Sequence, residues 1–355
     1  MALLIVVHEL GHFLAARLQG IHVNRFSIGF GPILWKYQGK ETEYALRAFP
    51  LGGFVGFPDD DPDSEIPAND PNLLRNRPIL DRAIVISAGV IANLIFAYFV
   101  FVAQYTAVGI PEKFDFQPGV VVPEVTSQES PAAKAGIKAG DIILAVDGQP
   151  LESSETAIRT LMDVIRAHPN QPLDFQIKRG QQQVDLNITP QVGDDGVAKI
   201  GVQLAPNGSI SQYRRPNGVF EVLGLAAEQF QSMFLTTVQG FWSLITDFAS
   251  VADKVAGPVK IVEQGAGLAS NNAAMLFPFT AIISINLAII NILPLPALDG
   301  GQLAFLLIEG LRGKPVPAKI QENVMQTGLV LLLGLGIFLM VRDTTQLQVF
   351  QRLFQ

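Results

Sequence analysis

The chain has 355 residues; 49% are hydrophobic, only 16% are charged, and none is cysteine. This composition, with a positive mean hydropathy, indicates a membrane protein with two or three structural units. The formal net charge of −7 argues against a nucleic-acid partner, because phosphates are bound by clusters of basic side chains. Without cysteine there can be no disulfide bond, and any metal ion must be held by histidine and carboxylate.

The first predicted element is an apolar helix over residues 1–18, which is short for a membrane span of about 20 residues. It has neither the basic start nor the small-residue cleavage site of a signal peptide, so we do not expect it to be removed. The helix contains an H-E-x-x-H pattern, His8-Glu9-Leu10-Gly11-His12. Because only seven residues precede this motif, the sequence suggests that a few residues are missing upstream.

The chemistry of this motif follows from helical spacing. His8 and His12 are four residues apart, so they lie on one face and can bind one metal ion. Glu9 lies beside them, where its carboxylate can take a proton from a metal-bound water. Such groups are costly in an apolar run unless they have partners, so we favour a metal site over a pair of merely hydrogen-bonded histidines.

The next two segments are polar or mixed. Residues 20–57 alternate apolar and polar positions around glycine-rich turns, which predicts short strands. They form either a hairpin at the membrane that offers strand edges to an extended substrate or an ordinary hairpin, and the residues alone do not decide. Residues 58–78 are rich in Asp, Pro and Asn and predict a solvated loop, since their spacing does not match a calcium-binding loop.

A second membrane span is predicted over residues 83–111, which contain no charged side chain. Asn93 lies within this run, near Gly89 and Ala92. A polar amide among small residues is typical of a contact between membrane helices, although it could also reach an active site. We favour helix packing as its role.

Residues 116–205 predict a soluble α+β domain. Strands are expected at 120–125, 142–146, 173–178 and 184–189, with a helix over 156–168. The run from Ser130 to Gly148, S-P-A-A-K-A-G-I-K-A-G-D-I-I-L-A-V-D-G, closely resembles a PDZ domain. The resemblance implies a groove between a strand edge and the 156–168 helix, where a peptide or a substrate terminus can add as a strand.

The last part of the chain returns to apolar character. Residues 219–249 are amphipathic, which predicts a helix on the membrane surface or against other helices. Spans are predicted over 273–293, with Pro278 as a possible kink, and over 323–341. Between them, Asp299 follows a proline-rich break; it is a candidate functional residue or an N-cap of a helix starting near Gln302.

Orientation follows from basic residues in the loops. With four spans, the 17–82 and 311–322 segments lie on one side and carry eight and three lysines and arginines. Positively charged loops favour the cytoplasmic side, so the PDZ-like domain is expected on the extracytoplasmic side.

A catalytic zinc site usually has three protein ligands and one open position. His8 and His12 supply two; His22 has the wrong spacing, and His168 lies in the PDZ-like domain. A carboxylate is therefore the better third ligand, and Asp299 is the acid most closely tied to a membrane run. It reaches the histidines if the first and third spans pack together.

Two motifs flank the PDZ-like domain: H-E-L-G-H and N-I-L-P-L-P-A-L-D-G. Together with that domain, they resemble the site-2 protease family of intramembrane zinc metalloproteases, in a bacterial or plastid form. The resemblance covers nearly the whole chain. It implies that His8, His12 and Asp299 bind one zinc ion per chain and that Glu9 is the general base. It also implies substrate-binding residues around the glycine-rich hairpin and the second motif: Asn291, Gly52, Gly53, Phe54 and Pro294. Gly89-Val90 departs from the Gly-Pro expected in many relatives.

The expected fold is an α-helical membrane protein with about four transmembrane helices, a membrane-associated β-hairpin region and an inserted α+β PDZ domain. We place an N-terminal membrane half at 1–112, with the hairpin at 20–57 and the second span at 83–111. The PDZ domain follows at 116–205, and the amphipathic helix and C-terminal membrane half occupy 206–355.

The expected function is hydrolysis of peptide bonds within or near the membrane segment of single-span proteins, such as a pre-cleaved anti-sigma factor, in a bacterial inner (plasma) or plastid membrane. The alternative is a non-catalytic membrane scaffold whose PDZ domain is the working part. A divalent-metal transporter would need more polar ligands within its spans.

Overall fold

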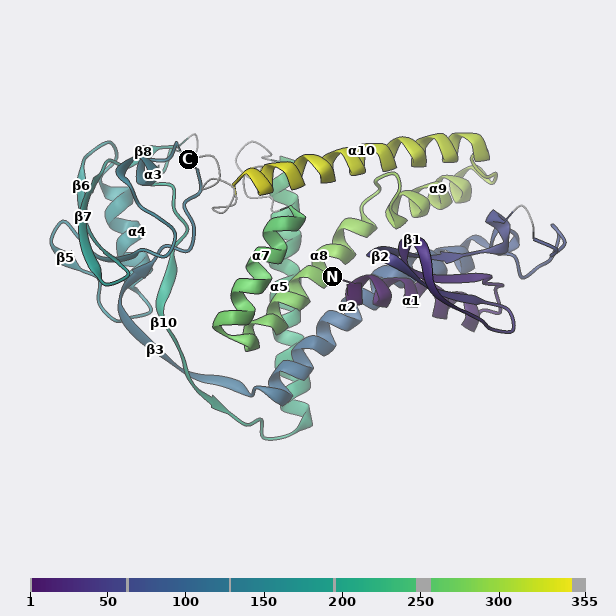
Figure 1. The fold of residues 1–355 in the computed structure, drawn as a ribbon, viewed down its shortest axis with the longest axis horizontal. Helices are drawn as coiled ribbons and strands as arrows, with labels where there is room; N and C mark the ends of the chain where they lie inside the picture. Colours follow the sequence, from purple (N-terminus) through teal and green to yellow (C-terminus); the bar gives the residue numbers. More distant parts are fainter. Residues whose placement is uncertain (1, 62–63, 128, 194–195, 247–256, 347–355) are drawn as a thin grey trace. The chain divides into compact units, whose positions relative to one another are not determined.

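The computed structural model describes residues 2–61, 64–127, 129–193, 196–246 and 257–346 (Figure 1). These residues form two compact units. One unit comprises residues 2–107, 217–246 and 257–346 and is mainly helical; the other comprises residues 108–216, within the ranges just given, and is mainly β. Each unit is described separately below.

The helical unit is rich in long apolar helices. Three helical segments in the described chain are long and apolar enough to cross a membrane: 79–107, 273–292 and 318–345. The first predicted span is also a helix, but it has only 17 residues. The protein is therefore a multi-span membrane protein, as expected. The helices are α1 (Ala2–Leu18), α2 (Ile79–Ala107), α5 (Val219–Thr246), α7 (Pro258–Asn271), α8 (Leu276–Ile292), α9 (Asp299–Arg312) and α10 (Ala318–Gln346).

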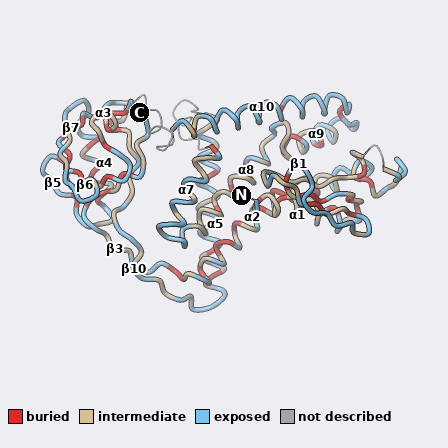
Figure 2. Tube along the Cα trace, viewed as in Figure 1, coloured by how far each residue is buried: buried red, intermediate tan, exposed pale blue. Residues whose placement is uncertain are grey.

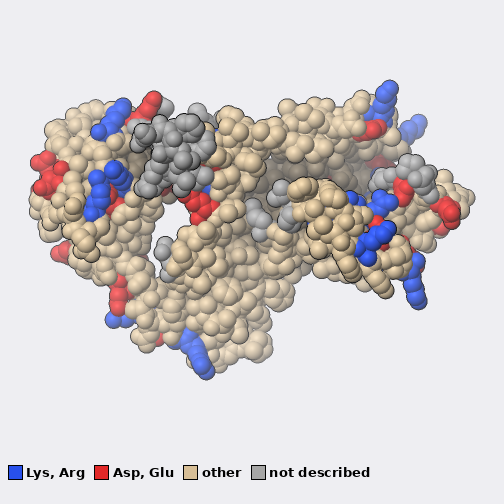
Figure 3. Space-filling model, viewed as in Figure 1, with Lys and Arg blue, Asp and Glu red and all other residues tan. Residues whose placement is uncertain are grey.

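Charge and burial are distributed as a lipid-facing unit requires. On the face seen in Figure 3, most charged side chains of this unit lie around β1, β2 and the adjoining loops and at the end where α9 leads into α10, and the middle of the helices carries few. Helix α10 is exposed along most of its length in Figure 2, although its sequence is strongly apolar. In a membrane these apolar side chains face lipid tails instead of water, so their exposure carries no free-energy cost.

Helix α2 is the centre of this unit because it packs against both α1 and α8. Close approach to α1 depends on Gly11: a Cβ there would lie 2.8 Å from both the carbonyl carbon of Ala88 and the Cβ of Ala92. Small residues at such a crossing let two helices meet without a hydrophobic driving force between them. The expected approach of the first span to the third is therefore supported mainly by α2, which packs against both.

Several predicted boundaries differ from the observed ones. The second span starts at Ile79 and ends at Ala107, because Gly109 has a φ of +98° and strand β3 begins immediately afterwards. The predicted kink at Pro278 is wrong: this proline lies in the first turn of α8, where its missing N–H would have no helical partner. The amphipathic helix is α5, and it packs against α2, where Tyr98 donates to the carbonyl of Leu223 at 3.3 Å.

The predicted hairpin region forms a more elaborate sheet from β1 (Arg25–Gln38) and β2 (Glu43–Gly56). Residues 33–38 pair antiparallel with 43–47, as in a hairpin. Residues 25–28, however, pair in parallel with 43–46 and antiparallel with 53–56. The order across the sheet is thus 33–38, 43–47, 25–28 and 53–56, and the last segment has a described strand partner on one side only. We call residues 53–56 the edge segment.

The second unit is the α+β unit whose Ser130–Gly148 run resembles a PDZ domain. Its main antiparallel sheet has the order β10-β3-β4-β6-β7, with β5 paired to β4. Apolar side chains from the sheet and from α4, including Phe175 and Leu161, form its core. Its strands are β3 (Ile110–Val121), β4 (Ile142–Val146), β5 (Gln149–Pro150), β6 (Leu173–Arg179), β7 (Gln182–Ile188), β8 (Gln191–Val192), β9 (Ala198–Lys199) and β10 (Ala205–Arg214), and its helices are α3 (Pro131–Ala135) and α4 (Ala157–Ala167).

The predicted strands that correspond to β4, β6 and β7 and the predicted helix that corresponds to α4 agree with the structure to within two residues, whereas β5, β8, β9 and β10 were not predicted. Ser130 caps α3 by accepting from the N–H of Ala133 at 3.2 Å, and Gly136 ends the helix with a φ of +92°. The first strand is the exception, because β3 begins ten residues before the predicted Val120. It does so because its early part pairs with β10, a strand that local patterns did not reveal.

A buried ion pair links the α3–β4 turn of this unit to β6. Asp141 is 1% exposed as a side chain and accepts two hydrogen bonds from Arg179, at 2.8 and 2.7 Å. It also accepts from the N–H of Lys138 at 2.8 Å. Burial by itself raises the pKa of Asp141, but these hydrogen bonds outweigh burial and hold its pKa below the usual value.

Replacing Asp141 with Ala is therefore expected to destabilise the PDZ unit by about 1.5–3 kcal/mol at pH 7, the worth of hydrogen bonds to a charged group. Hydrogen exchange in the full-length protein should show faster exchange of the β4 and β6 amides. Because the folded-state pKa is lowered, this stabilisation is present above about pH 4 and is lost as the pH falls through the folded pKa. The exposed Asp163→Ala on α4 is the control, and equal exchange in the two variants would contradict the assignment.

Candidate metal centre

The H-E-x-x-H motif lies in the middle of α1, and helical spacing brings its two histidines together. The Nε2 atoms of His8 and His12 are 3.2 Å apart, and the ring planes are nearly perpendicular. Both side chains are about nine-tenths buried. The sequence prediction that both rings lie on one helix face is therefore confirmed.

Asp299 reaches the same point from the other end of the chain. Helix α8 ends at Ile292, and a proline-rich turn with Ala297 at a φ of +69° leads directly into α9. The Asp299 Oδ2 atom lies 3.2 Å from His8 Nε2 and 3.5 Å from His12 Nε2. The N-cap interpretation of Asp299 is wrong, because Leu298 is the N-cap and Asp299 is the first residue of the helix.

These three side chains fit a cation. The Nδ1 atom of His12 lies 2.8 Å from the carbonyl oxygen of Val85, which can only accept, so the ring proton is on Nδ1 and Nε2 carries a lone pair. That lone pair faces Asp299 Oδ2, which is buried and makes no hydrogen bond although it lies within ion-pair distance of both rings. The lone pair of His12 Nε2 and the free Oδ2 of Asp299 point at one place beside His8 Nε2. Atoms arranged in this way can bind a divalent metal ion.

The kinds of side chain at the site are also those that the sequence predicted. Two imidazoles and one carboxylate give three ligands, and all three ligand atoms lie within 4.8 Å of one another. Among the described residues, no other group of three or more such side chains is close enough to hold a metal. His22 instead lies 3.7 Å from Asp70, and His168 hydrogen-bonds the carbonyl of Val164 at 2.8 Å.

Space for the two rings comes from a glycine on α2. A Cβ on Gly89 would lie 2.7 Å from the Cε1 atoms of both His8 and His12, and closer still to His12 Nε2. Any side chain at this position would therefore occupy the place of the imidazoles. The sequence marked Gly89 as a small residue near Asn93 and as part of a departure from a family pattern, but it gave no sign of this role.

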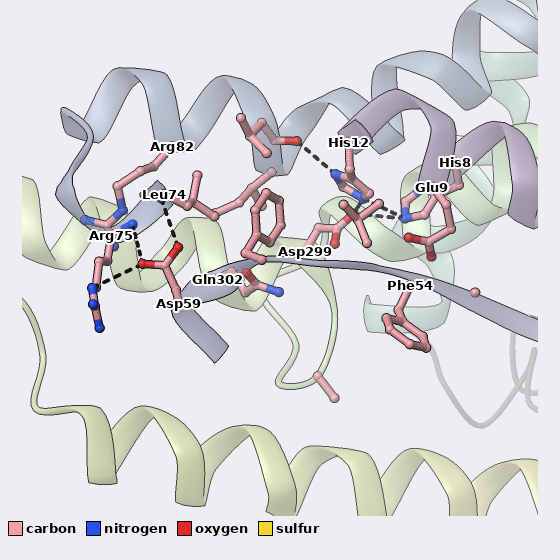
Figure 4. A pocket seen from close by; sticks show the side chains of 16 residues that line it. His8, Glu9, His12, Phe54, Asp59, Leu74, Arg75, Arg82, Asp299 and Gln302 are labelled. Atoms are coloured by element: carbon pink, nitrogen blue, oxygen red, sulfur yellow. Dashed lines mark hydrogen bonds and ion pairs between the residues drawn. The ribbon is translucent and has the colours of Figure 1, made fainter. Parts of the chain in front are cut away.

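A cavity of about 520 Å³ opens on the cluster (Figure 4). His8, His12 and Asp299 lie at one end of it, with Glu9 beside them, and Asp59, Arg75 and Arg82 lie toward the other end. Its lining also includes residues that the sequence did not single out: Val55, Phe57, Leu74, Val85, Ile86, Ala297 and Gln302. Polar groups and water can therefore reach a cluster that belongs to an apolar helical unit.

The edge segment of the sheet runs along this cavity. A Cβ on Gly53 would lie 2.9 Å from Glu9 Cγ, so the backbone passes close to the carboxylate. The carbonyl of Gly56 accepts from the N–H of Asn24, and strand alternation then turns the backbone groups of Gly53 and Val55 outward. In agreement, the Val55 backbone lies near enough to Glu9 to influence its carboxylate.

Arg47 connects the edge segment to the rest of the sheet. It donates to the Ser27 hydroxyl at 2.8 Å and to the Gly31 carbonyl at 2.9 Å. Its guanidinium carbon also lies 5.6 Å from the centre of the Phe54 ring, within the range of a cation–π contact. Arg47 therefore adds one side-chain contact, to Phe54, to the strand pairing that holds the edge segment.

The structure places the other predicted site residues unequally. Asn291, near the end of α8, has its amide nitrogen 3.3 Å from His8 Nε2 and so lies within the cluster. Gly53 and Phe54 line the cavity. Gly52 and Pro294 do not line it: a Cβ on Gly52 would meet the Phe30 ring, and Pro294 is exposed in the turn after α8.

An ion pair between Arg82 and Glu309 joins α2 to α9. Arg82 Nη1 lies 2.8 and 3.0 Å from the two carboxylate oxygens of Glu309, and both side chains are mostly buried. Because Asp299 begins α9 and the histidines contact α2, this pair helps to hold the two halves of the cluster together. Sequence spacing gave no sign of it, since the partners are far apart in the chain.

Comparisons with known proteins agree with one another. Residues 1–335 match the model of "Peptidase family M50". "Putative zinc metalloprotease all3971" of Nostoc sp. is 59% identical over 360 residues, covering 100% of this chain and 98% of that protein. "Membrane metalloprotease ARASP, chloroplastic" of Arabidopsis thaliana is 49% identical, covering 97% and 77%. "Regulator of sigma-E protease RseP" of Salmonella typhimurium is 29% identical, covering 95% and 96%.

Gly89→Ala is expected to weaken zinc binding by at least about tenfold, since the new methyl group takes the place of the His12 ring. Metal analysis of purified protein should show less than one zinc per chain, approaching the value for Asp299→Ala. Gly334→Ala is the matched control, because a Cβ on this glycine of α10 would have nothing within 4 Å of it. Full zinc content in Gly89→Ala would show that the rings do not bind metal in this arrangement.

Proposed function

The chain belongs to peptidase family M50, the zinc metalloprotease family of its relatives, and on this basis we propose that it cuts single-span membrane proteins within or near their membrane segments. The observation that carries the proposal is the convergence of His8, His12 and Asp299 beside Glu9. These groups come from opposite ends of the chain and meet in a cavity of a multi-span membrane unit. A site of this kind acts on peptide bonds that water does not otherwise reach.

We assign His8, His12 and Asp299 as the ligands of one zinc ion per chain. When bound, zinc polarises the scissile carbonyl and lowers the pKa of a water molecule. Glu9 accepts the proton of the attacking water and then passes it to the leaving amine. The Asn291 amide, next to the His8 ring, is placed to donate to the substrate carbonyl or its oxyanion.

The substrate binds as an extended strand in this proposal. A helical membrane segment uses its own backbone hydrogen bonds and hides its peptide bonds, so it must unwind before it is cut. The outward backbone groups of Gly53 and Val55 can pair with the unwound segment beside Glu9. Phe54 lines the same cavity. Gly52, next to Gly53 in strand β2, and Pro294, in the turn after α8, complete the proposed substrate-binding set although they do not line the cavity.

The substrate class is a single-span membrane protein, such as an anti-sigma factor that another protease has already trimmed. The relative named "Regulator of sigma-E protease RseP" supports this example. The cellular membrane is a bacterial inner (plasma) or plastid membrane, consistent with the bacterial and chloroplastic relatives. The basic loops favour a cytoplasmic side for the cavity and an extracytoplasmic side for the PDZ domain.

The PDZ domain has a groove of its own. A cavity of about 540 Å³ lies between α4, through Ile158, Met162 and Ile165, and the segment 197–204. We propose that it binds a peptide or a freshly cut substrate terminus, or that the domain limits the size of substrates. This groove is also the observation that favours the second candidate function, a non-catalytic scaffold. A scaffold would keep its activity in the presence of a metal chelator, whereas a protease would lose it.

Glu9→Gln is expected to lower cleavage of a trimmed single-span substrate by about 10²–10⁴-fold, because the amide cannot act as a base. Zinc content should remain at one per chain, since Glu9 is not assigned as a ligand. Gel analysis of a co-reconstituted substrate and metal analysis of the same preparation measure the two quantities. Cleavage at the wild-type rate by this variant would exclude the proposed mechanism.

Arg47→Met is expected to lower kcat/KM by about tenfold without changing zinc content, because the edge segment loses its anchor beside Glu9. Lys40→Met is the matched control, as it removes an exposed positive charge from the turn between β1 and β2. Both variants would be assayed with the same reconstituted substrate. A loss of zinc in Arg47→Met, or equal activity of the two variants, would contradict the role given to the edge segment.

A further inference from the structure

One stripe of α2 contacts both histidines from behind. Val85, Gly89 and Asn93 are spaced by four residues and therefore lie on one helix face. Val85 offers its carbonyl to His12 Nδ1, and Gly89 leaves room for both rings. Asn93 lies beside His8, with its amide nitrogen 3.5 Å from the ring Nδ1. Each histidine thus has an α2 partner on the nitrogen that does not face Asp299.

Helix packing does not explain the side chain of Asn93. The residue is 0% exposed, and its side-chain Oδ1 is buried without a hydrogen-bond partner among the described residues. The contact with α8 uses the backbone instead, since the Ser284 hydroxyl donates to the Asn93 carbonyl at 2.8 Å. The packing role predicted for Asn93 is therefore carried by its backbone. Its side-chain amide takes no part in that contact.

The Asn93 amide can face His8 Nδ1 in either of two orientations. With Nδ2 toward the ring, Asn93 could donate to Nδ1 only if the ring proton were on Nε2, between His8 and Asp299. A proton there conflicts with Asn291, whose amide nitrogen faces the same Nε2 at 3.3 Å. A half-turn of the amide exchanges oxygen and nitrogen with almost no change in shape. Oδ1 then accepts from Nδ1–H, and Nε2 is left with a lone pair toward Asp299. Val85 holds the His12 ring in the same way, because its carbonyl accepts from Nδ1–H.

We propose that Asn93 is a positioning residue for the metal site, which holds the His8 ring by accepting a hydrogen bond from its Nδ1–H. This inference rests on the proposed function of the His8, His12 and Asp299 cluster as a zinc site. A neutral amide does so without adding a charge to an apolar helix crossing. Partners of this kind orient a metal-binding histidine and raise metal affinity.

Zinc affinity of the full-length protein in detergent micelles tests this role, in a Glu9→Gln background that prevents self-cleavage. The dissociation constant is measured by competition with a chromogenic chelator. Asn93→Leu keeps the volume but removes both hydrogen-bonding groups, and we expect it to weaken zinc binding about 10- to 100-fold. Asn93→Asp keeps the acceptor and should bind zinc within about threefold of the parent, as a carboxylate is a common partner of metal-bound histidine.

Ser284→Ala is the matched control for helix packing, because it removes the buried hydrogen bond to the Asn93 backbone but leaves the amide. It should bind zinc within about threefold of the parent, since it does not touch His8. The visible absorption of the cobalt(II)-substituted protein should be the same in the parent, Asn93→Asp and Ser284→Ala, and altered in Asn93→Leu. A change of spectrum reports ligand geometry, which a general loss of stability would not alter.

The outcomes distinguish the proposed role of Asn93 from the proposed zinc site itself. An Asn93→Leu protein that binds zinc as tightly as the parent would overturn the role of Asn93. So would equal losses in Asn93→Leu and Asn93→Asp, or a loss in Ser284→Ala as large as that in Asn93→Leu. A parent protein without any zinc affinity would overturn the proposed function itself. If leucine prevents folding, Asn93→Ala is expected to show the same loss of affinity and the same altered spectrum.

Discussion

The convergence of three electron-pair donors in an apolar helical unit is the constraint on which this structure depends. Two imidazoles and a carboxylate lose their hydration when they are buried, and the buried Oδ2 of Asp299 has no hydrogen bond to replace it. A divalent cation at this point would satisfy all three groups together. The surrounding fold can be understood as the means of bringing these donors to one place and holding them there.

Helix α2 provides most of that support although it contributes no metal ligand. It packs between α1, which carries the histidines, and α8, which leads to Asp299. Close contact requires small residues: Gly11 meets the backbone of Ala88, and Gly89 makes room for the rings. The two glycines after Asp299 have a related role, because a Cβ on Gly300 or Gly301 would collide with the carbonyls of the turn before it. The L-D-G-G sequence thus reflects a backbone that folds back on itself.

Two binding surfaces of different kinds accompany this centre, one in each unit. The edge segment offers backbone hydrogen bonds beside Glu9, and these are sequence-independent. The PDZ groove is lined largely by apolar side chains, which favour particular ligands. In the proposed function, the edge segment would bind an unwound peptide with little side-chain selectivity, and the PDZ groove would apply the selection.

The sequence by itself determined the membrane class, the His8-Glu9-His12 face and the PDZ-like domain, because these depend on composition, helical spacing and a contiguous motif. It also identified Asp299 as the third candidate ligand, by elimination and family resemblance. Only the tertiary structure decided how Asp299 reaches the histidines, why Gly89 is needed and what Asn93 contacts. The same is true of the parallel pairing that makes residues 53–56 an edge. These features arise where residues distant in the chain meet in space, and local periodicity carries no information about which helix faces or strand edges will be neighbours.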